Sequence, residues 1–309
     1  MSVRPIRRVI TPKPTLEGAG VKLRRGFGFG DTSEFDPFLL FDDFRNDRPD
    51  DYRAGFPWHP HRGIETITYV LAGTVEHRDS LGNKGALGPG DVQWMTAGRG
   101  ILHQEMPEGD PQGRMHGFQL WANLPSNLKM TAPRYQDVKG GEIPEIVDDD
   151  GTRVRVICGD FWGRRGPVEG VAADPRYLDV WVPPGRRKTL PVEIERHAFA
   201  YVFEGAGSFR SASQPFGVLT TKPSRSVIAT RRRVAPADEA AAGVVPRPPA
   251  RGRAQRRRAA SRSPASASRR DASIAATWPC HGMSPAASRA ASRGRPSASS
   301  ARDRAPRTK

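Results

Sequence analysis

The chain has 309 residues, two cysteines and a formal net charge of +16. Residues 1–220 carry 28 Lys and Arg against 29 Asp and Glu, whereas residues 221–309 carry 21 against 4. The nearly neutral first stretch lacks the excess of basic residues expected of a nucleic-acid-binding domain, and two cysteines exclude a disulfide framework.

The sequence also indicates where the protein resides. It contains no run of 18 apolar residues that would predict a membrane-spanning helix. The basic start MSVRPIRRVI is not followed by the apolar segment of a secretory signal. We therefore expect a soluble cytoplasmic protein. Cys158 follows the apolar alternation of VRVIC, so we expect its thiol to be buried.

Short alternating strands follow one another through the first 220 residues. They are separated by turn clusters such as LGNKG, LGPGD, AGRG and VPPGR. Since the 3.6-residue period of amphipathic helices is almost absent, the pattern predicts an all-β fold of barrels or sandwiches. In chain order, the predicted strands lie in the segments 65–79 (ETITYVLAGTVEHRD), 90–98 (GDVQWMTAG), 115–124 (MHGFQLWANL), 152–161 (TRVRVICGDF), 177–185 (YLDVWVPPG) and 199–210 (FAYVFEGAGSFR).

Two passages resemble each other and indicate an internal repeat. ETITYVLAGTV at 65–75 and HAFAYVFEGAGSF at 197–209 are both alternating strands that enter a glycine turn. We expect two copies of one barrel, with boundaries at 1–130 and 131–220. The composition then changes to Arg, Ala, Ser and Pro, which cannot bury enough apolar surface to offset the entropy of ordering. Residues 221–309 are therefore predicted to form a disordered basic tail.

Two pairs of polar residues have the spacing of metal ligands on strands. His59 and His61 are two residues apart, as are His103 and Glu105 about forty residues later. On a strand, this spacing puts both side chains on one face. A single His-x-His is more often ordinary strand polarity, but two such pairs on neighbouring strands would converge. Three imidazoles and one carboxylate suit a divalent transition metal with open positions.

Other polar residues carry weaker expectations. His77 lies in an alternating strand, and we place it at the barrel rim. His116 and His197 are expected to be structural, and the second barrel is expected to hold no metal. Glu65 shares the parity of His61 and is either a fifth ligand or, as we favour, a hydrogen-bond acceptor behind the ligands.

The segment from 56 to 107, FPWHPHRGIETITYV through WMTAGRGILHQEMP, resembles the pirin family of the cupin superfamily. FDPFLLFDDF and AFAYVFEGAGSF resemble further pirin segments, and the likeness extends from residue 1 to about 220. It implies a bicupin fold with iron in the N-terminal barrel. The family's ligands fall on His59, His61, His103 and Glu105. Many pirins have Asp where this chain has Trp58, a difference that leaves the ligands intact.

The resemblance implies two functions. Some pirins resemble quercetin 2,3-dioxygenases, which open a flavonol ring with O2, and this implies Fe(2+) and a flat phenolic substrate. Glu105 is the natural candidate for the base if it can leave the metal, because a carboxylate beside an imidazole cluster can accept the proton. Trp58, Phe56 and Trp94 could stack on a flat substrate, but we favour ordinary barrel packing for these aromatic residues. Other pirins are iron-dependent regulators that bind a transcription factor or a metabolic enzyme. An open pocket above the metal favours the enzyme, and a filled one favours the regulator.

The tail bears on partners and on the second barrel. It would bind nucleic acid only non-specifically through its charge, and we expect neither a membrane partner nor an oligomer. Family resemblance ends soon after FGVLTTKPSR, which we interpret as a frameshift after about Leu219, with a natural basic extension as the alternative. A frameshift would truncate the second barrel and expose strand edges. Translating the other reading frames of the gene would separate the two interpretations.

Overall fold

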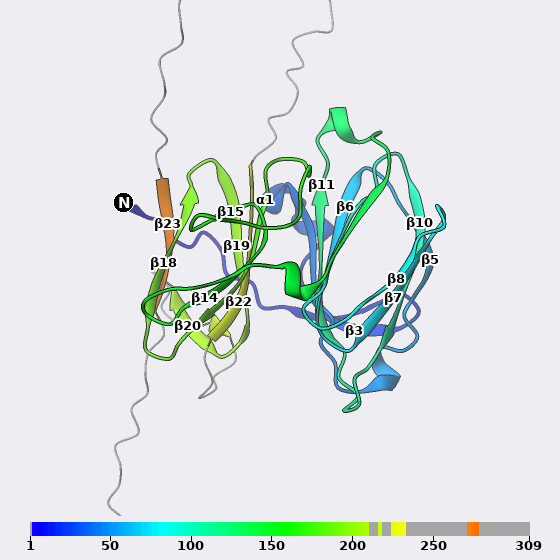
Figure 1. Cartoon of the computed structure of the whole chain (residues 1–309), viewed down its shortest axis with the longest axis horizontal. Helices are drawn as coiled ribbons and strands as arrows, with labels where there is room; N and C mark the ends of the chain where they lie inside the picture. Colours follow the sequence, from blue (N-terminus) through cyan, green and yellow to red (C-terminus); the bar gives the residue numbers. More distant parts are fainter. Residues whose placement is uncertain (1, 210–215, 218–223, 233–270, 278–309) are drawn as a thin grey trace, which may run out of the picture. The chain divides into compact units, whose positions relative to one another are not determined.

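The computed structural model of this protein describes residues 2–209, 216–217, 224–232 and 271–277, which form mainly β-strands (Figure 1). The predicted all-β fold is thereby confirmed. The helical elements in the described ranges are short, and they are α1 (Thr32–Phe35), η1 (Phe29–Asp31), η2 (Pro49–Asp51), η3 (Ser126–Leu128) and η4 (Gly140–Glu142). None of the helices in these ranges has the length and apolar character needed to cross a membrane.

The N-terminal barrel consists of a seven-stranded and a four-stranded sheet. The order in the larger sheet is β12 (Arg134–Val138), β9 (Val92–Thr96), β6 (Ile64–Ala72), β11 (His116–Asn123), β4 (Phe38–Asp43), β3 (Val21–Phe27) and β2 (Lys13–Glu17). The order in the smaller sheet is β5 (Phe56–His61), β10 (Ile101–Glu108), β7 (Thr74–Asp79) and β8 (Lys84–Leu87). Because β12 pairs with β9, this barrel extends past the boundary expected at residue 130.

Strand β6 shows how the larger sheet separates two environments. Side chains alternate between the faces of a strand. Val70 packs with Val75 of the opposite sheet, so Thr68 and Val70 point into the barrel. Ile67 and Tyr69 belong to a different apolar cluster on the other face. Both faces of β6 are therefore covered.

The C-terminal strands form a second pair of sheets. One sheet has the order β13 (Glu145–Val147), β14 (Arg153–Cys158), β17 (Arg176–Val182), β22 (Ser224–Arg232) and β19 (Arg196–Glu204). The other contains β1 (Ser2–Val3), β23 (Asp271–Thr277), β20 (Ala206–Phe209), β21 (Phe216–Gly217) and β18 (Arg187–Glu193). A short hairpin is formed by β15 (Asp160–Phe161) and β16 (Arg164–Arg165).

Two of these strands correct the boundary at residue 220. Strand β22 pairs with β17 and β19, and β23 pairs with β18, although both lie in the stretch predicted to be disordered. The sequence SVIAT in β22 has the apolar, β-branched character that a sheet position favours. The expectation of disorder for 233–270 and 278–309 concerns residues outside the described ranges.

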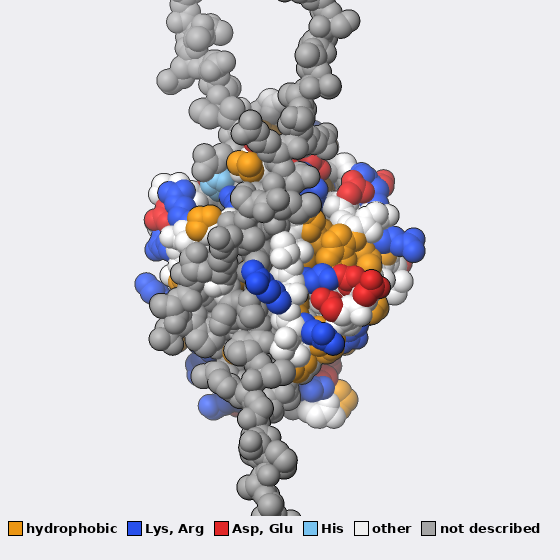
Figure 2. All heavy atoms as spheres, turned by 90° about the vertical axis from the view of Figure 1, so that its left-hand side faces the viewer, with side chains coloured by type: hydrophobic (Ala, Val, Ile, Leu, Met, Phe, Trp, Pro, Cys, Tyr) orange, Lys and Arg blue, Asp and Glu red, His pale blue; other side chains and the backbone are white. Residues whose placement is uncertain are grey.

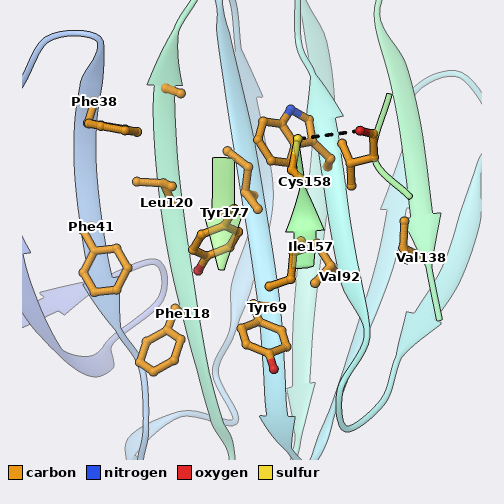
Figure 3. Close-up of a cluster of buried hydrophobic side chains, with 14 of the residues drawn as sticks. Phe38, Phe41, Tyr69, Val92, Phe118, Leu120, Val138, Ile157, Cys158 and Tyr177 are labelled. Carbon is orange, nitrogen blue, oxygen red and sulfur yellow. Dashed lines mark hydrogen bonds between the residues drawn. The ribbon is translucent and has the colours of Figure 1, made fainter. Parts of the chain in front are cut away.

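The outer face of the seven-stranded sheet packs on side chains of the second barrel (Figure 3). Phe118 and Tyr69 of the first barrel share this cluster with Ile157 and Tyr177 of the second. Cys158 lies in the same cluster and is 1 % exposed, which confirms the expected buried thiol. Its Sγ donates to the Val168 carbonyl at 3.6 Å. Burial of this apolar area contributes to the stability of both barrels.

Polar contacts accompany the apolar cluster. The Tyr69 hydroxyl donates to Asp179 Oδ2 at 2.7 Å and accepts from Arg155 Nη1 at 2.8 Å. Arg45 Nη1 donates to the Phe203 carbonyl at 2.8 Å. On the described surface in Figure 2, basic and acidic side chains lie interspersed, in line with the balanced charge of the first 220 residues.

Candidate metal centre

Neighbouring strands of the four-stranded sheet bring three histidines together. His103 of β10 lies directly opposite His59 of β5, and Ile101 lies opposite His61. The Nε2 atom of His59 is 3.0 Å from Nε2 of His61 and 2.9 Å from Nε2 of His103. The ligating atoms of the three histidines all lie within 4.8 Å of one another. Side-chain alternation and strand register therefore produce the convergence that the two spaced pairs predicted.

Glu105 lies beside this triad, displaced by a β-bulge. The register shifts between His103 and Glu105, so that Glu105 pairs with Phe56. Its Oε2 is 3.8 Å from His103 Nε2, and its Oε1 accepts a hydrogen bond from Thr68 at 3.1 Å. The carboxylate is thus adjacent to the three nitrogens but is held on one side by the opposite sheet.

The separations between the nitrogens fit a metal ion. Imidazole nitrogens bind such ions at about 2.1 Å, so two ligands at right angles would be about 3.0 Å apart. The observed separations of 2.9 and 3.0 Å agree with this value. Three imidazoles with an adjacent carboxylate also match the chemistry of non-haem iron and related divalent ions. His59, His61, His103 and Glu105 are therefore suited to hold one.

Burial keeps two of the imidazoles in the form that binds metals. Burial, with the neighbouring imidazoles His103 and His59, lowers the pKa of His61 to about 3. Burial, together with His59 and His77, likewise lowers the pKa of His103 to about 3. Both side chains are therefore neutral near pH 7, and their lone pairs face a cation without competition from a proton.

We predict that the metal-free protein loses stability as the pH falls from about 6.5 towards 3. An unfolded histidine has a pKa of 6.5, whereas His61 and His103 titrate at about 3 when folded. Between these values the unfolded chain binds more protons, so the free energy of unfolding falls with the pH; above 6.5 this contribution is constant. Urea unfolding of chelator-treated protein at pH 7, 6, 5 and 4 measures the effect. The His61→Asn/His103→Asn variant should show a shallower slope, and equal slopes would contradict the assignment.

A cavity of about 460 Å³ lies beside the histidine triad. Among its lining residues are two candidate ligands, His59 and Glu105, and Trp121, whose ring lies 4.8 Å from the His61 ring. Trp58, which is 53 % exposed, also lines the cavity. The remaining wall is largely apolar and includes Val21, Leu23, Leu40, Phe44, Val75 and Met115. The cavity has the size and apolar lining of a small-molecule site.

Comparison with known proteins places this architecture. The pirin family profile matches residues 20–122. A pirin-like protein of Caulobacter vibrioides is 50% identical over 206 residues, which cover 66% of this chain and 74% of the relative. Human pirin is 44% identical over 205 residues, which cover 66% of this chain and 68% of the relative. This chain belongs to the pirin family.

A solved structure shares the fold of this pirin. The crystal structure of quercetin 2,3-dioxygenase from Acinetobacter baumannii has a TM-score of 0.64 and 29% identity, and it covers 72% of this chain and 84% of that chain. The family match at 20–122 contains all four candidate ligands and the strands β5 and β10 that carry them. The resemblance noted from the sequence is confirmed.

Glu65 and Trp94 lie on the face of the seven-stranded sheet that is turned away from the barrel interior and the candidate ligands. Glu65 has the parity of Ile67 and accepts from Thr96 Oγ1 at 3.1 Å. It therefore points away from the barrel interior, where Thr68 contacts Glu105. Trp94 is buried in the cluster between the barrels and does not line the cavity. The parity of His61 does not carry over to Glu65, because β5 and β6 belong to different sheets.

The other histidines occupy three different environments. His77 is not at the rim: it is 2 % exposed, and its ring lies 5.2 Å from the His103 ring. Within the part of the chain that the structure describes, neither of its ring nitrogens has a hydrogen-bond partner. His116 Nε2 contacts Asp47 Oδ1 at 2.5 Å, in keeping with a structural role. His197 is half-buried in β19 of the second barrel.

Proposed function

We propose that this pirin opens the ring of a flavonol or related flat phenol with O2, in the manner of a quercetin 2,3-dioxygenase. Ferrous iron would be held by His59, His61, His103 and Glu105. The observation that carries the proposal is the cavity of about 460 Å³ that is lined by His59 and Glu105, because it gives a small molecule access to two of the candidate ligands. Similarity to the Acinetobacter baumannii quercetin 2,3-dioxygenase supports this reaction class.

Glu105 is the proton acceptor in this proposal. Its Oε1 is held by the Thr68 hydroxyl, so Oε2, the oxygen that faces His103, would leave the metal to take the proton of the substrate hydroxyl. Because burial lowers the pKa values of His61 and His103 to about 3, these imidazoles are weaker proton acceptors than an ordinary histidine. When bound, ferrous iron would supply Lewis acidity towards the resulting enolate oxygen and reactivity towards dioxygen.

The cavity walls would orient the flat substrate and exclude water. Trp121 stands edge-on to the His61 ring, at an interplanar angle of 78°. Its indole, with Phe56 and Trp58 nearer the solvent, offers aromatic surface to a planar ring. The Arg25 guanidinium on the same wall is paired with Asp42 at 2.8 and 2.7 Å and with Glu17 at 2.8 Å, so it has no unpaired charge to offer an anionic substrate. The site therefore favours a neutral aromatic compound over a highly charged one.

The regulatory alternative predicts a filled pocket above the metal. The cavity is lined by side chains of both sheets and reaches Glu105, so this feature favours the enzyme. Oxidation of the metal could still alter the surface offered to a partner protein. That alternative becomes the better explanation if the metal-loaded protein has no dioxygenase activity.

We predict that the iron-loaded protein consumes O2 with quercetin and that Trp121→Ala lowers kcat/KM at least about tenfold, which corresponds to about 1.4 kcal/mol. The loss follows from removing the aromatic wall beside His61. An oxygen electrode, with quercetin absorbance followed in parallel, measures the reaction. Trp181→Ala in β17 of the second barrel is the matched control and should leave the rate unchanged. No O2 consumption by protein shown to contain iron would refute the proposed activity.

A further inference from the structure

The Glu105 carboxylate is tied to two polar residues of the opposite sheet. Thr68 Oγ1 lies 3.1 Å from Glu105 Oε1 and 2.6 Å from Gln119 Oε1. Thr68 is 3 % exposed, and Glu105 is buried as well. Buried polar groups of this kind are costly unless each is paired. The three side chains form one connected group across the barrel interior.

The chemistry of a hydroxyl gives this group a direction. Thr68 has a single proton and cannot donate to both of its neighbours. The Thr68 hydroxyl lies within donating distance of the Glu105 carboxylate oxygen Oε1, which is the acceptor. The Thr68 hydroxyl oxygen can then accept a hydrogen bond from the Gln119 amide. This requires the Gln119 amide to be turned by about 180°, so that Nε2 takes the place of Oε1. The satisfied arrangement runs from the Gln119 N–H to Thr68 and from the Thr68 O–H to Glu105.

The strand register places these hydrogen-bonded side chains in one row across the seven-stranded sheet. Gln119 of β11 lies directly between Thr68 of β6 and Asp42 of β4, and Asp42 lies opposite Arg25 of β3. Asp42 is held by both guanidinium contacts of Arg25. Cross-strand partners in such a row are about 5 Å apart at their Cβ atoms. The Gln119 side chain therefore projects from the same row of residues as Thr68 and the Arg25–Asp42 ion pair.

We propose that Thr68 and Gln119 are positioning residues for Glu105: they hold Oε1 from the opposite sheet and so set how Oε2 is presented to a metal at His59, His61 and His103. This inference rests on the proposed function only in that a metal occupies the triad. It assigns the two residues no contact with the metal. Outer hydrogen-bond partners of this kind typically alter metal affinity 10- to 100-fold when removed.

The first test measures metal binding by the full chain, with Co²⁺ as the probe. Thr68→Val removes the hydroxyl at nearly constant volume, and we expect Co²⁺ affinity to fall about 10- to 100-fold and the visible Co²⁺ spectrum to change. Thr68→Ser should restore both. Thr66→Val is the matched control, because Thr66 is a buried threonine of the same strand and parity. Circular dichroism checks that each variant is folded.

The second test asks whether the two residues act in series. Gln119→Leu alone should lower Co²⁺ affinity, whereas adding it to Thr68→Val should have little further effect, because the link to Glu105 is already broken. Fully additive losses would show that Gln119 does not act through Thr68, and they would overturn the proposed series of hydrogen bonds from Gln119 through Thr68 to Glu105. Unchanged affinity and spectrum in Thr68→Val, with wild type binding Co²⁺, would overturn the inference alone. A wild-type protein without Co²⁺ binding would overturn it together with the proposed metal site.

If wild type binds Co²⁺ and Thr68→Val shows the expected losses, the positioning role holds whatever the outcome with quercetin. Lack of quercetin turnover by the iron form would then count against the proposed reaction alone. Binding and catalysis are thus tested by separate measurements.

Discussion

Replacement of His103 by alanine should abolish stoichiometric binding of a divalent transition metal. His103 Nε2 lies 2.9 Å from His59 Nε2 and 3.8 Å from Glu105 Oε2, so it lies next to candidate ligands of both pairs. Its loss removes a ligand outright, and we expect affinity to fall by more than the 10- to 100-fold typical of outer hydrogen-bond partners. Metal analysis of wild-type and variant protein, purified in parallel, measures the effect.

His116→Ala is the matched control for this experiment. It makes the same chemical change, but His116 contacts Asp47 and does not line the cavity. The control should retain the metal content of wild type. A His103→Ala protein that is folded and still carries one metal per chain would show that the triad is not the binding site, and the proposed oxygen chemistry would fall with it.

The four candidate ligands were predictable because their signal is local. Two residues on one face of a strand need only a spacing of two, which His59 with His61 and His103 with Glu105 both have. What the spacing does not contain is the register between β5 and β10, or the bulge that shifts Glu105 opposite Phe56. The pair of motifs implied convergence, and the bulge decided how closely Glu105 approaches the histidines.

The alternation of side chains does not identify the interior face of a strand when both of its faces are covered. From Glu65 to Val70 every residue of β6 is buried, so alternation of apolar and polar residues could not tell the barrel interior from the face that meets the second barrel. Glu65 is expected beside the ligands only from its parity with His61, whereas Trp94 has the packing role that we favour from the sequence. The sequence alone indicates that β6 is buried, but it does not show that the second barrel covers one of its two faces.

Several residues at the site carry no local signal. Thr68, Gln119 and Trp121 are ordinary strand residues, and their importance arises from register across β6 and β11 and from contacts with the other sheet. Strands β22 and β23 were missed for a related reason. Their short apolar segments, SVIAT in β22 and SIAAT in β23, stand within Arg-, Ala- and Ser-rich sequence, and pairing with β17, β19 and β18 shows their place.

Replacement of Phe118 by alanine should lower the free energy of unfolding by about 3–5 kcal/mol, the range for buried Phe→Ala changes. Phe118 is fully buried, and its ring lies 5.6 Å from Phe41 in the first barrel and 4.9 Å from Phe203 in the second. The change would leave a void in the cluster that both barrels share. Urea unfolding of the chelator-treated proteins, followed by circular dichroism, measures it.

Phe118 lies on the face of β11 that is turned away from the candidate metal site, so its replacement should affect stability without affecting metal binding. Gln119 lines the cavity, and Phe118 points the other way, so folded Phe118→Ala should keep its Co²⁺ affinity. Phe29→Ala is the matched control, because Phe29 is 63 % exposed and its truncation should change the free energy of unfolding by no more than about 0.5 kcal/mol. Equal effects of the two substitutions would contradict a shared core between the barrels. A large loss confined to Phe118→Ala would mean that the cluster shared by the two barrels stabilises the chain, although all the candidate ligands lie within residues 59–105 and outside this cluster.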